Sequence, residues 1–227
     1  MSHLKRLYAP KTWAVKRKGI KFIVKSIPGT HSLKLSVPIA LLFRDLLKYA
    51  TNLREVKSIL LNKNVLVDSV RRKDYRFPVG IFDVIEIKET KEIFRVIFDG
   101  RKIGLLKIDK NEANLKPCKI TGKRKIGKKV QLNLYDGKNI LVDKDAYKAG
   151  DTIIIEFPKN IKSHLKLEKG NLIYLIGGKH IGVVGSVESI SGDKIKYKST
   201  EGVFETLKKY AFVVGVDKPF VSIKKIR

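Results

Sequence analysis

The side chains that could do chemistry in this sequence are above all cationic. The 227 residues include 49 Lys and Arg against 22 Asp and Glu, which gives a formal net charge of +27 and a pI near 10.1. So large an excess indicates a polyanionic partner, and nucleic acid is the commonest one. An anionic membrane is the other candidate, but no apolar run approaches the length of a membrane span. We therefore expect a nucleic-acid partner and no membrane partner.

The basic residues gather in four stretches, and each could neutralise backbone phosphates. The stretches are an N-terminal arm, a segment over 44–73, a segment around residue 124 and a glycine-rich segment around residue 180. The candidate nucleic-acid-binding residues are Lys5, Arg6, Lys11, Trp13, Lys16, Arg17, Lys18, Arg44, Lys48, Arg54, Lys57, Lys63, Arg71, Arg72, Lys73, Lys123, Arg124, Lys125, Lys179 and His180.

The N-terminal arm is the most one-sided of these stretches. From Met1 to Arg44, a range that includes this arm, the chain has ten Lys or Arg and no Asp or Glu. A solvated charged loop is one interpretation, but ordinary surfaces mix charges of both signs. The absence of acidic residues favours an arm that becomes ordered on folded RNA. There its cations would neutralise phosphates, and Trp13 or Tyr8 would stack or fill a groove.

Other kinds of site find little support in the sequence. Residues 122–129 match a phosphate-binding P-loop except at the end, where Lys129 replaces the Ser or Thr that binds magnesium. Cys118 is the only cysteine, which excludes an internal disulfide, argues against a zinc site and fits a reducing cytoplasm. The four histidines are scattered and no carboxylate pair suggests acid–base catalysis. We expect no catalytic residue, no metal and no cofactor.

Two amphipathic helices and a short sheet are predicted to position the second basic stretch. Apolar residues over 39–50 recur on one face of a helix, which leaves Arg44 off that face. A second helix opens at the N-cap Asn52, and Glu55 can reach back to free backbone N–H groups. A strand and a turn follow over 65–69, with basic residues just beyond. Such a module would present one basic surface.

This stretch resembles the S-four-type RNA-binding domain of ribosomal proteins, pseudouridine synthases and some tRNA synthetases. The matching residues are Leu53-Arg54-Glu55-Val56, Ile59-Leu60-Leu61, Val65-Leu66-Val67-Asp68 and Val79-Gly80-Ile81-Phe82-Asp83-Val84-Ile85. One position departs from the family pattern, because Ser69 stands where the turn usually carries Gly. Serine tolerates a left-handed turn less well than glycine, which leaves the type of this turn open.

The central part of the chain has the pattern of a β protein. Hairpins are predicted over 93–108, with a turn at Asp99-Gly100, and over 130–142, with a turn at Asp136-Gly137. Another strand is predicted at 152–157, after a basic run at 116–129. Short strands separated by glycine turns indicate a small barrel or sandwich.

Residues 170–190 resemble a KOW motif. Its glycines would allow the tight turns of an SH3-like barrel, and Lys179 and His180 would sit at the exposed tip. Further strands are predicted at 194–198, around 212–214 and at 220–223, followed by a basic tail at 224–227.

The N-terminal residues narrow the resemblance to one family. They are similar to the opening of the e-type S-four proteins of the archaeal and eukaryotic small ribosomal subunit, through His3-Leu4-Lys5-Arg6-Leu7, Ala9-Pro10-Lys11-Thr12-Trp13, Pro28-Gly29-Thr30-His31-Ser32-Leu33 and Val37-Pro38-Ile39. The resemblance covers essentially the whole chain. It implies a structural constituent of the cytoplasmic ribosome rather than an enzyme or a homo-oligomer, with small-subunit rRNA and neighbouring ribosomal proteins as partners.

The resemblance also implies a multi-domain α+β fold. We expect a basic arm over 1–37, a two-helix-plus-sheet S-four-type domain over 38–91, a β-rich central domain over 92–169, and an SH3-like KOW barrel with C-terminal strands over 170–227.

Two other functions compete with this interpretation. An RNA-modifying enzyme such as a pseudouridine synthase would need a separate catalytic domain with a placed Asp, yet short hairpins fill the chain after Ile87. A transcription or RNA-chaperone factor would account for 170–227 but would leave the N-terminal sequence unexplained.

Overall fold

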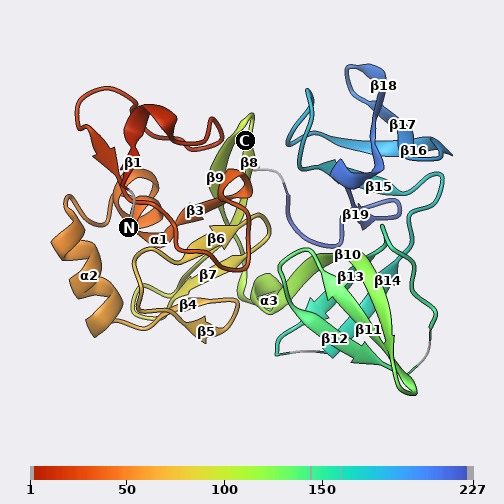
Figure 1. Ribbon diagram of the computed structural model, residues 1–227, viewed down its shortest axis with the longest axis horizontal. Helices are drawn as coiled ribbons and strands as arrows, with labels where there is room; N and C mark the ends of the chain where they lie inside the picture. Colours follow the sequence, from red (N-terminus) through yellow and green to blue (C-terminus); the bar gives the residue numbers. More distant parts are fainter. Residues whose placement is uncertain (1–2, 144, 159, 224–227) are drawn as a thin grey trace. The chain divides into compact units, whose positions relative to one another are not determined.

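The computed structural model describes residues 3–143, 145–158 and 160–223, and the basic tail at 224–227 lies outside them. The chain divides into two compact units, Met1–Ala113 and Asn114–Arg227. Each unit is mainly antiparallel β-sheet with few helices, as Figure 1 shows. The expected fold is therefore confirmed in its coarse form of several sheets with a small helical part.

The first unit contains one five-stranded sheet, in the order β5-β4-β7-β8-β9, and two small sheets, β1-β2 and β3-β6. Its strands are β1 (Leu4–Lys5), β2 (Phe22–Ile23), β3 (Ser36–Pro38), β4 (Val65–Val67), β5 (Val70–Arg71), β6 (Pro78–Gly80), β7 (Val84–Ile87), β8 (Glu92–Asp99) and β9 (Lys102–Lys107). Strand β7 pairs with β8 across the domain boundary expected at residues 91 and 92. The first unit accordingly continues past this expected boundary to residue 113.

The first unit has several short helical elements, and the one predicted over 39–50 is shorter than the apolar pattern predicts. They are η1 (Arg6–Tyr8), η2 (Leu33–Leu35), α1 (Ile39–Leu41), the π-helical turn η3 (Leu42–Leu46), α2 (Leu53–Asn62) and α3 (Lys110–Ala113). The helix predicted over 39–50 ends at Leu46, because Lys48 has a φ of +58° and the chain turns away there. In the described part of the chain, no helix is long and apolar enough to cross a membrane.

The second predicted helix forms as expected. The Asn52 side chain accepts a hydrogen bond from the backbone N–H of Glu55 at 3.0 Å, and the Glu55 carboxylate accepts one from the Thr51 N–H at 2.7 Å. These bonds satisfy donors that a helix start leaves open. Val56 and Leu60 are buried, whereas the basic side chains of Arg54 and Lys57 are exposed.

A buried polar group ties the arm to the rest of the first unit. His31 Nε2 lies 3.0 Å from Asp83 Oδ2, and that oxygen also accepts the backbone N–H of Gly80 at 2.8 Å. A Cβ on Gly80 would lie 2.3 Å from the His31 ring, so the position needs glycine. The segments around residues 31 and 80, which both resemble the families named above, are therefore in direct contact with each other.

The turns of the first unit refine two expectations. In the β4–β5 hairpin Asp68 and Ser69 have φ of +51° and +62°, so the turn is left-handed at both central residues although no glycine is present. In the β8–β9 hairpin Asp99 pairs with Lys102. The turn is therefore made by the two residues after Asp99, one position later than predicted.

The second unit contains two five-stranded sheets, in the orders β12-β11-β10-β13-β14 and β18-β17-β16-β15-β19. Their elements are β10 (Leu115–Ile126), β11 (Lys129–Leu134), β12 (Asn139–Val142), β13 (Thr152–Glu156), β14 (Asn160–Leu165), β15 (Leu172–Leu175), β16 (Val184–Ser191), β17 (Lys194–Ser199), β18 (Gly202–Leu207), η4 (Lys208–Tyr210) and β19 (Ala211–Gly215). The strands predicted at 130–142, 152–157 and 194–198 are confirmed. The strand predicted at 220–223 is wrong, because these residues form no strand in the structure; the isolated bridge between Gly215 and Pro219 comes just before them.

Each sheet of the second unit has its own apolar core, and buried polar contacts join the two. Thr152 Oγ1 accepts the backbone N–H of Val213 at 3.1 Å, and the rings of Tyr135 and Phe212 meet edge to face with centroids 5.1 Å apart. The cores are centred on Ile120 and Ile153 in one sheet and on Ile173, Tyr197 and Val213 in the other.

Candidate nucleic-acid interface

The largest predicted group of cations lies on α2 and the β4–β5 hairpin. Arg54, Lys57 and Lys63 are exposed on the helix and at its end, and Arg71 and Lys73 are exposed on the hairpin and just beyond it. Arg71 Nη2 donates to the carbonyl of Leu61 at 3.0 Å. This bond satisfies a carbonyl that the helix end leaves open and fixes the hairpin beside the helix.

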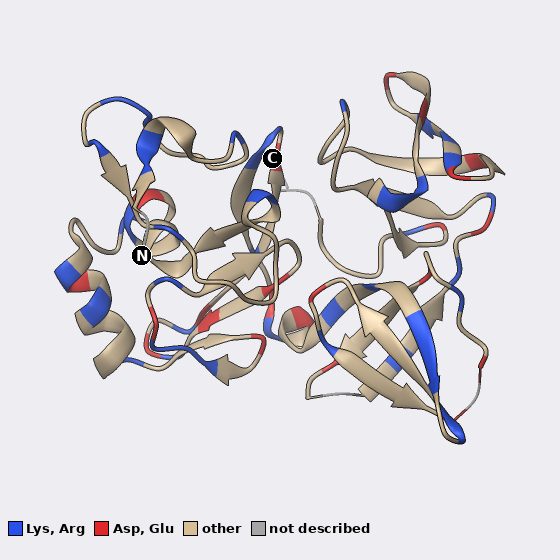
Figure 2. Cartoon of the chain, in the orientation of Figure 1, with Lys and Arg blue, Asp and Glu red and all other residues tan. Residues whose placement is uncertain are grey.

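Aromatic rings hold two cations of this region in place. Arg72 is half-buried, with its guanidinium carbon 4.3 Å from the centroid of the Phe77 ring. Lys57 Nζ lies 4.9 Å from the centroid of the Tyr75 ring. We call the cations of the helix, the hairpin and the following loop together the α2–hairpin face; in Figure 2, blue marks the Lys and Arg residues along these elements.

Two predicted residues flank this face with different surroundings. Lys48 is exposed. Arg44 is half-buried, and its Nη2 lies 2.9 Å from Asp45 Oδ2. This neighbouring carboxylate balances part of its charge.

The arm differs most from its prediction. Trp13 is only 1% exposed, and its indole N–H donates to the carbonyl of Ser36 at 2.7 Å. The predicted role of Trp13 in stacking on RNA is therefore wrong, since the ring is part of the protein core. The arm is also ordered by contacts within the first unit: Thr12 O accepts the N–H of Ile103 at 2.7 Å.

Two of the predicted arginines of the arm also point inward. Arg6 is 6% exposed and its Nη1 donates to the carbonyl of Lys16 at 2.7 Å. Arg17 donates to the carbonyls of Ala9 and Pro10 at 2.9 and 3.0 Å. Arg6 is therefore corrected from a surface residue to an internal donor, because folding a loop without regular structure leaves carbonyls that need donors.

The other predicted cations of the arm remain available on its surface. Lys5, Lys11, Lys16 and Lys18 are exposed. Tyr8 is 76% exposed, so it keeps the stacking role predicted for it or for Trp13.

In the second unit, the β10–β11 hairpin carries Lys123, Arg124 and Lys125 on exposed positions near its tip (Figure 2). Lys123 Nζ lies 2.5 Å from Asp145 Oδ1. Strand β10 presents these residues because Ile126 pairs with Lys129 and a two-residue turn closes the hairpin there.

Two lysines at the start of the same basic run are buried. Lys116 Nζ lies 3.1 Å from Asp136 Oδ2. Burial alone would raise the pKa of Asp136, but the charges of Lys116 and Lys138 hold that pKa below its usual range. Lys119 Nζ donates to the carbonyls of Lys208, Lys209 and Ala211, and burial lowers the pKa of Lys119 to about 8, with the charge of Lys208 contributing.

In the glycine-rich segment, only one of the two predicted binding residues is exposed. Lys179 is exposed, whereas His180 is half-buried, with its ring centroid 4.2 Å from that of Phe204. A Cβ on Gly185 would lie 2.6 Å from the carbonyl oxygen of Lys198, which confirms that close approach requires glycine there. The prediction of His180 at an exposed tip is corrected by its contact with Phe204.

Sequence reasoning did not select several cations beside these surfaces. Lys21 and Lys25 are exposed in the arm, and Lys128 and Lys129 are exposed at the tip of the β10–β11 hairpin. All four lysines lie within the basic runs, so selecting every cation of each run would have included them. Among the described residues, no group of three or more His, Cys, Asp or Glu side chains could hold a metal ion.

Comparison with known proteins identifies the family. Residues 90–161 match Ribosomal family S4e, and residues 2–34 match the RS4NT (NUC023) domain. The small ribosomal subunit protein eS4 of Methanosphaera stadtmanae is 42% identical over 230 residues, which cover 97% of this chain and 95% of that protein. The protein of the same name from Methanocaldococcus jannaschii is 40% identical over 238 residues, with 97% of both chains covered.

A solved structure agrees with the sequence relatives. The crystal structure of the 30S ribosomal protein S4e from Thermoplasma acidophilum matches with a TM-score of 0.71 and 31% identity, covering 82% of this chain and 99% of that one. The resemblance drawn from the N-terminal residues is confirmed by both kinds of comparison. The chain belongs to the S4e family of small-subunit ribosomal proteins, which are structural proteins and not enzymes.

Proposed function

We propose that this protein is a structural constituent of the small ribosomal subunit that binds rRNA through basic surfaces on several small modules and so supports subunit assembly and translation. The observation that carries the proposal is the set of exposed cations held on folded elements, above all the α2–hairpin face and the tip of the β10–β11 hairpin. Rigid elements with cations at fixed positions suit folded RNA, whose phosphates also have fixed positions.

The mechanism we propose is electrostatic anchoring combined with recognition of shape. Each surface neutralises nearby phosphates, and the packed cores of the two units fix the positions of the cations within each unit. Neutralising ~10 phosphates would give a slope of roughly −7 to −9 for the logarithm of affinity against the logarithm of salt concentration. Small-subunit rRNA and neighbouring ribosomal proteins are the proposed partners, and we expect one copy per subunit rather than a homo-oligomer.

Two recognisable modules belong to this proposal. Residues 38–91 would be the S-four-type module, supported by the capped α2 and by the left-handed turn at Ser69. The sheet over 172–215 would be the KOW module, supported by its five antiparallel strands and by the close contacts of Gly185. In this proposal the arm and strands β8 and β9 would act together with the S-four-type module, supported by the β7–β8 pairing and by the hydrogen bond from the Ile103 N–H to the Thr12 carbonyl.

The direct test is sedimentation of a cell extract on a density gradient at low and at high salt. We expect the protein to co-migrate with small subunits in roughly stoichiometric amounts and to resist moderate salt, because many dispersed contacts act together. A peak of free protein, or migration with RNA polymerase, would contradict the proposal.

A charge-reversal pair makes the same test specific to one surface. Arg54→Glu with Lys57→Glu should reduce incorporation into subunits while the fold stays intact, since both side chains are exposed. Lys162→Glu with Lys169→Glu is a matched control, because it reverses two exposed charges of the second unit that lie outside the predicted surfaces. Equal incorporation of the two variants would show that the main binding surface is not on α2.

A further inference from the structure

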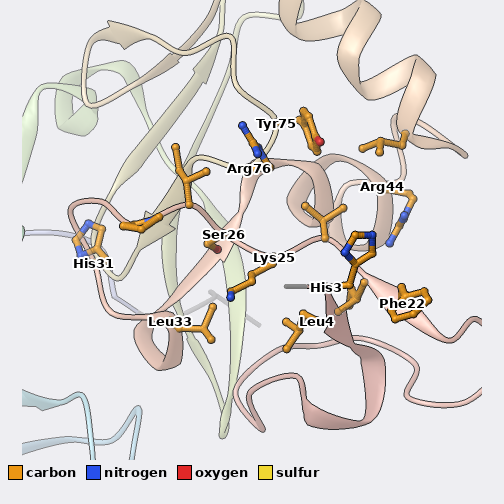
Figure 3. A pocket seen from close by; sticks show the side chains of 15 residues that line it. His3, Leu4, Phe22, Lys25, Ser26, His31, Leu33, Arg44, Tyr75 and Arg76 are labelled. Carbon is orange, nitrogen blue, oxygen red and sulfur yellow. The ribbon is translucent and has the colours of Figure 1, made fainter. Parts of the chain in front are cut away.

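A cavity of about 950 Å³ lies beside the arm in the first unit. Residues of the arm form one wall and the loop at 75–76 forms another. In Figure 3, Tyr75 and Arg76 lie on one side of the space, and Leu4 and Lys25 lie on the other. The volume is at the upper end of the range for small-molecule sites, which is large enough for a nucleotide.

Apolar side chains make most of the wall, and cations supply its charge. Of the described residues that line the cavity, none is acidic, and the lysines and arginines among them are Lys25, Arg44 and Arg76. Asp45 Oδ2 accepts from Nε and Nη2 of Arg44 at 3.2 and 2.9 Å, and Asp74 Oδ2 accepts from Nη2 of Arg76 at 3.2 Å. Both guanidinium groups are therefore held in place at the wall, and a neighbouring carboxylate balances part of the charge of each.

Ser26 gives an independent observation at the same place. Its Oγ is buried and has no hydrogen-bond partner among the described residues. A buried hydroxyl without a partner lowers stability unless a ligand or a water molecule satisfies it. Ser26 lines the cavity, and Figure 3 shows it between the two walls. Because this oxygen has almost no accessible surface, a polar edge in the cavity reaches the hydroxyl only when neighbouring side chains move aside.

Phe22 provides a ring for stacking. It is 43% exposed, and His3 packs against it with 5.4 Å between ring centroids and 76° between planes. Lys21 Nζ lies 5.5 Å from the centroid of the same ring. A partly exposed aromatic ring among cations is the kind of surface on which unpaired bases stack.

We propose that this cavity receives an unpaired base of the small-subunit rRNA, stacked on Phe22 and hydrogen-bonded to Ser26, with its phosphate near Lys25 and Arg44. The proposal rests on rRNA binding as the proposed function and adds a specific site to it. An apolar side chain of a neighbouring protein would fill the space but would bring no anion to the cations. Charge complementarity therefore favours the nucleotide.

The test compares two phenylalanine variants of the full-length protein in binding to purified small-subunit rRNA at several salt concentrations. Phe22→Ala should weaken binding by about 5- to 150-fold, the range for losing one stacked base, and should leave the salt slope unchanged because no charge is removed. Phe220→Ala is the matched control, since Phe220 is 40% exposed and lies in the second unit. It should bind as the unaltered protein does.

The outcomes separate this site from rRNA binding in general. Equal affinities of Phe22→Ala and Phe220→Ala, with strong binding by the unaltered protein, would overturn the base site and leave the proposed function standing. An unaltered protein that does not bind small-subunit rRNA would overturn the proposed function and this site with it.

Ser26→Ala provides a second variant with two opposite readouts. Removing a hydroxyl that lacks a partner should raise the midpoint of thermal unfolding of the free protein, whereas rRNA binding should weaken by about 2- to 10-fold. A variant of lower stability that binds equally well would contradict the proposal.

Ultraviolet cross-linking of intact small subunits identifies the occupant. We expect a nucleotide attached to the peptide that carries residue 22 or residue 75. Attachment of these peptides to a neighbouring ribosomal protein instead would contradict the proposal that a nucleotide occupies the cavity.

Discussion

The N-terminal arm and the β10–β11 hairpin have similar runs of basic residues but use them differently. In the arm, Arg6 and Arg17 donate to backbone carbonyls of the arm itself. In the hairpin, Arg124 and Lys125 are exposed on a strand whose backbone bonds are already made by its neighbour. An irregular loop needs side-chain donors for its carbonyls and a paired strand does not. Charge density therefore predicts binding for a segment but not for each residue in it.

The largest expected effect is a loss of stability caused by removing a buried side chain of the arm. Trp13→Ala should lower the free energy of unfolding by about 3–5 kcal/mol, because it removes a buried aromatic side chain and leaves a cavity. Urea denaturation measures the change, and Tyr8→Ala is the control because Tyr8 is 76% exposed. Unchanged stability of Trp13→Ala together with weaker rRNA binding would restore the stacking role to Trp13.

Two double variants compare the regions at equal change of charge. Arg124→Gln with Lys125→Gln should reduce the steepness of the salt slope for rRNA binding by about 2 and change stability by less than about 0.5 kcal/mol. Arg6→Gln with Arg17→Gln should lower the free energy of unfolding by about 1.5–3 kcal/mol or more, since it removes hydrogen bonds of charged donors to carbonyls. Equal salt slopes in the two double variants would show that the arm and the hairpin do not differ.

Lys119 shows that the hairpin's own basic run contains an inward-pointing residue. Its pKa in the folded protein is about 8, below the ordinary value of 10.5, so the unfolded chain binds more protons between these values. The contribution of Lys119 to stability should therefore rise with pH from about 8 to 10.5, by up to about 1.4 kcal/mol per pH unit. Urea denaturation of the unaltered protein and of Lys119→Met over this range isolates the effect. A difference between them that does not vary with pH would contradict it.

The smallest expected effect concerns Arg71, which combines both uses. Its guanidinium bonds the Leu61 carbonyl and is still exposed. Arg71→Gln should lower the free energy of unfolding by about 0.5–1.5 kcal/mol, the contribution of one hydrogen bond, and should also weaken rRNA binding. Thermal unfolding and filter binding of the same sample measure both. A loss of stability with no loss of affinity would make Arg71 a purely structural residue.

Local patterns predicted the parts of the fold that depend on neighbouring residues. The cap of α2 at Asn52 and Glu55, the strand at 65–67 and the hairpin over 130–142 formed as expected. The cap, the hairpin and the pairing of β4 with β5 depend on residues close together in the sequence, whereas β4 also pairs with β7 farther along the chain. Strand β18 was missed because its alternating side chains are largely exposed, which hides the apolar face that marks a strand.

Long-range contacts account for what the sequence could not show. The burial of Trp13 depends on the carbonyl of Ser36, and the order of the arm depends on Ile103, which lies far along the chain. The cavity beside Phe22 depends on Tyr75 and Arg76 folding back onto the arm. Charge runs alone contain no information about such partners.

The salt dependence of binding to purified small-subunit rRNA tests most directly whether dispersed exposed cations anchor the protein. For the unaltered protein we predict a slope of roughly −7 to −9 for the logarithm of affinity against the logarithm of salt concentration, as expected for ~10 neutralised phosphates. The variant Arg124→Gln with Lys125→Gln should have a slope less steep by about 2. A slope near zero for the unaltered protein would contradict electrostatic anchoring.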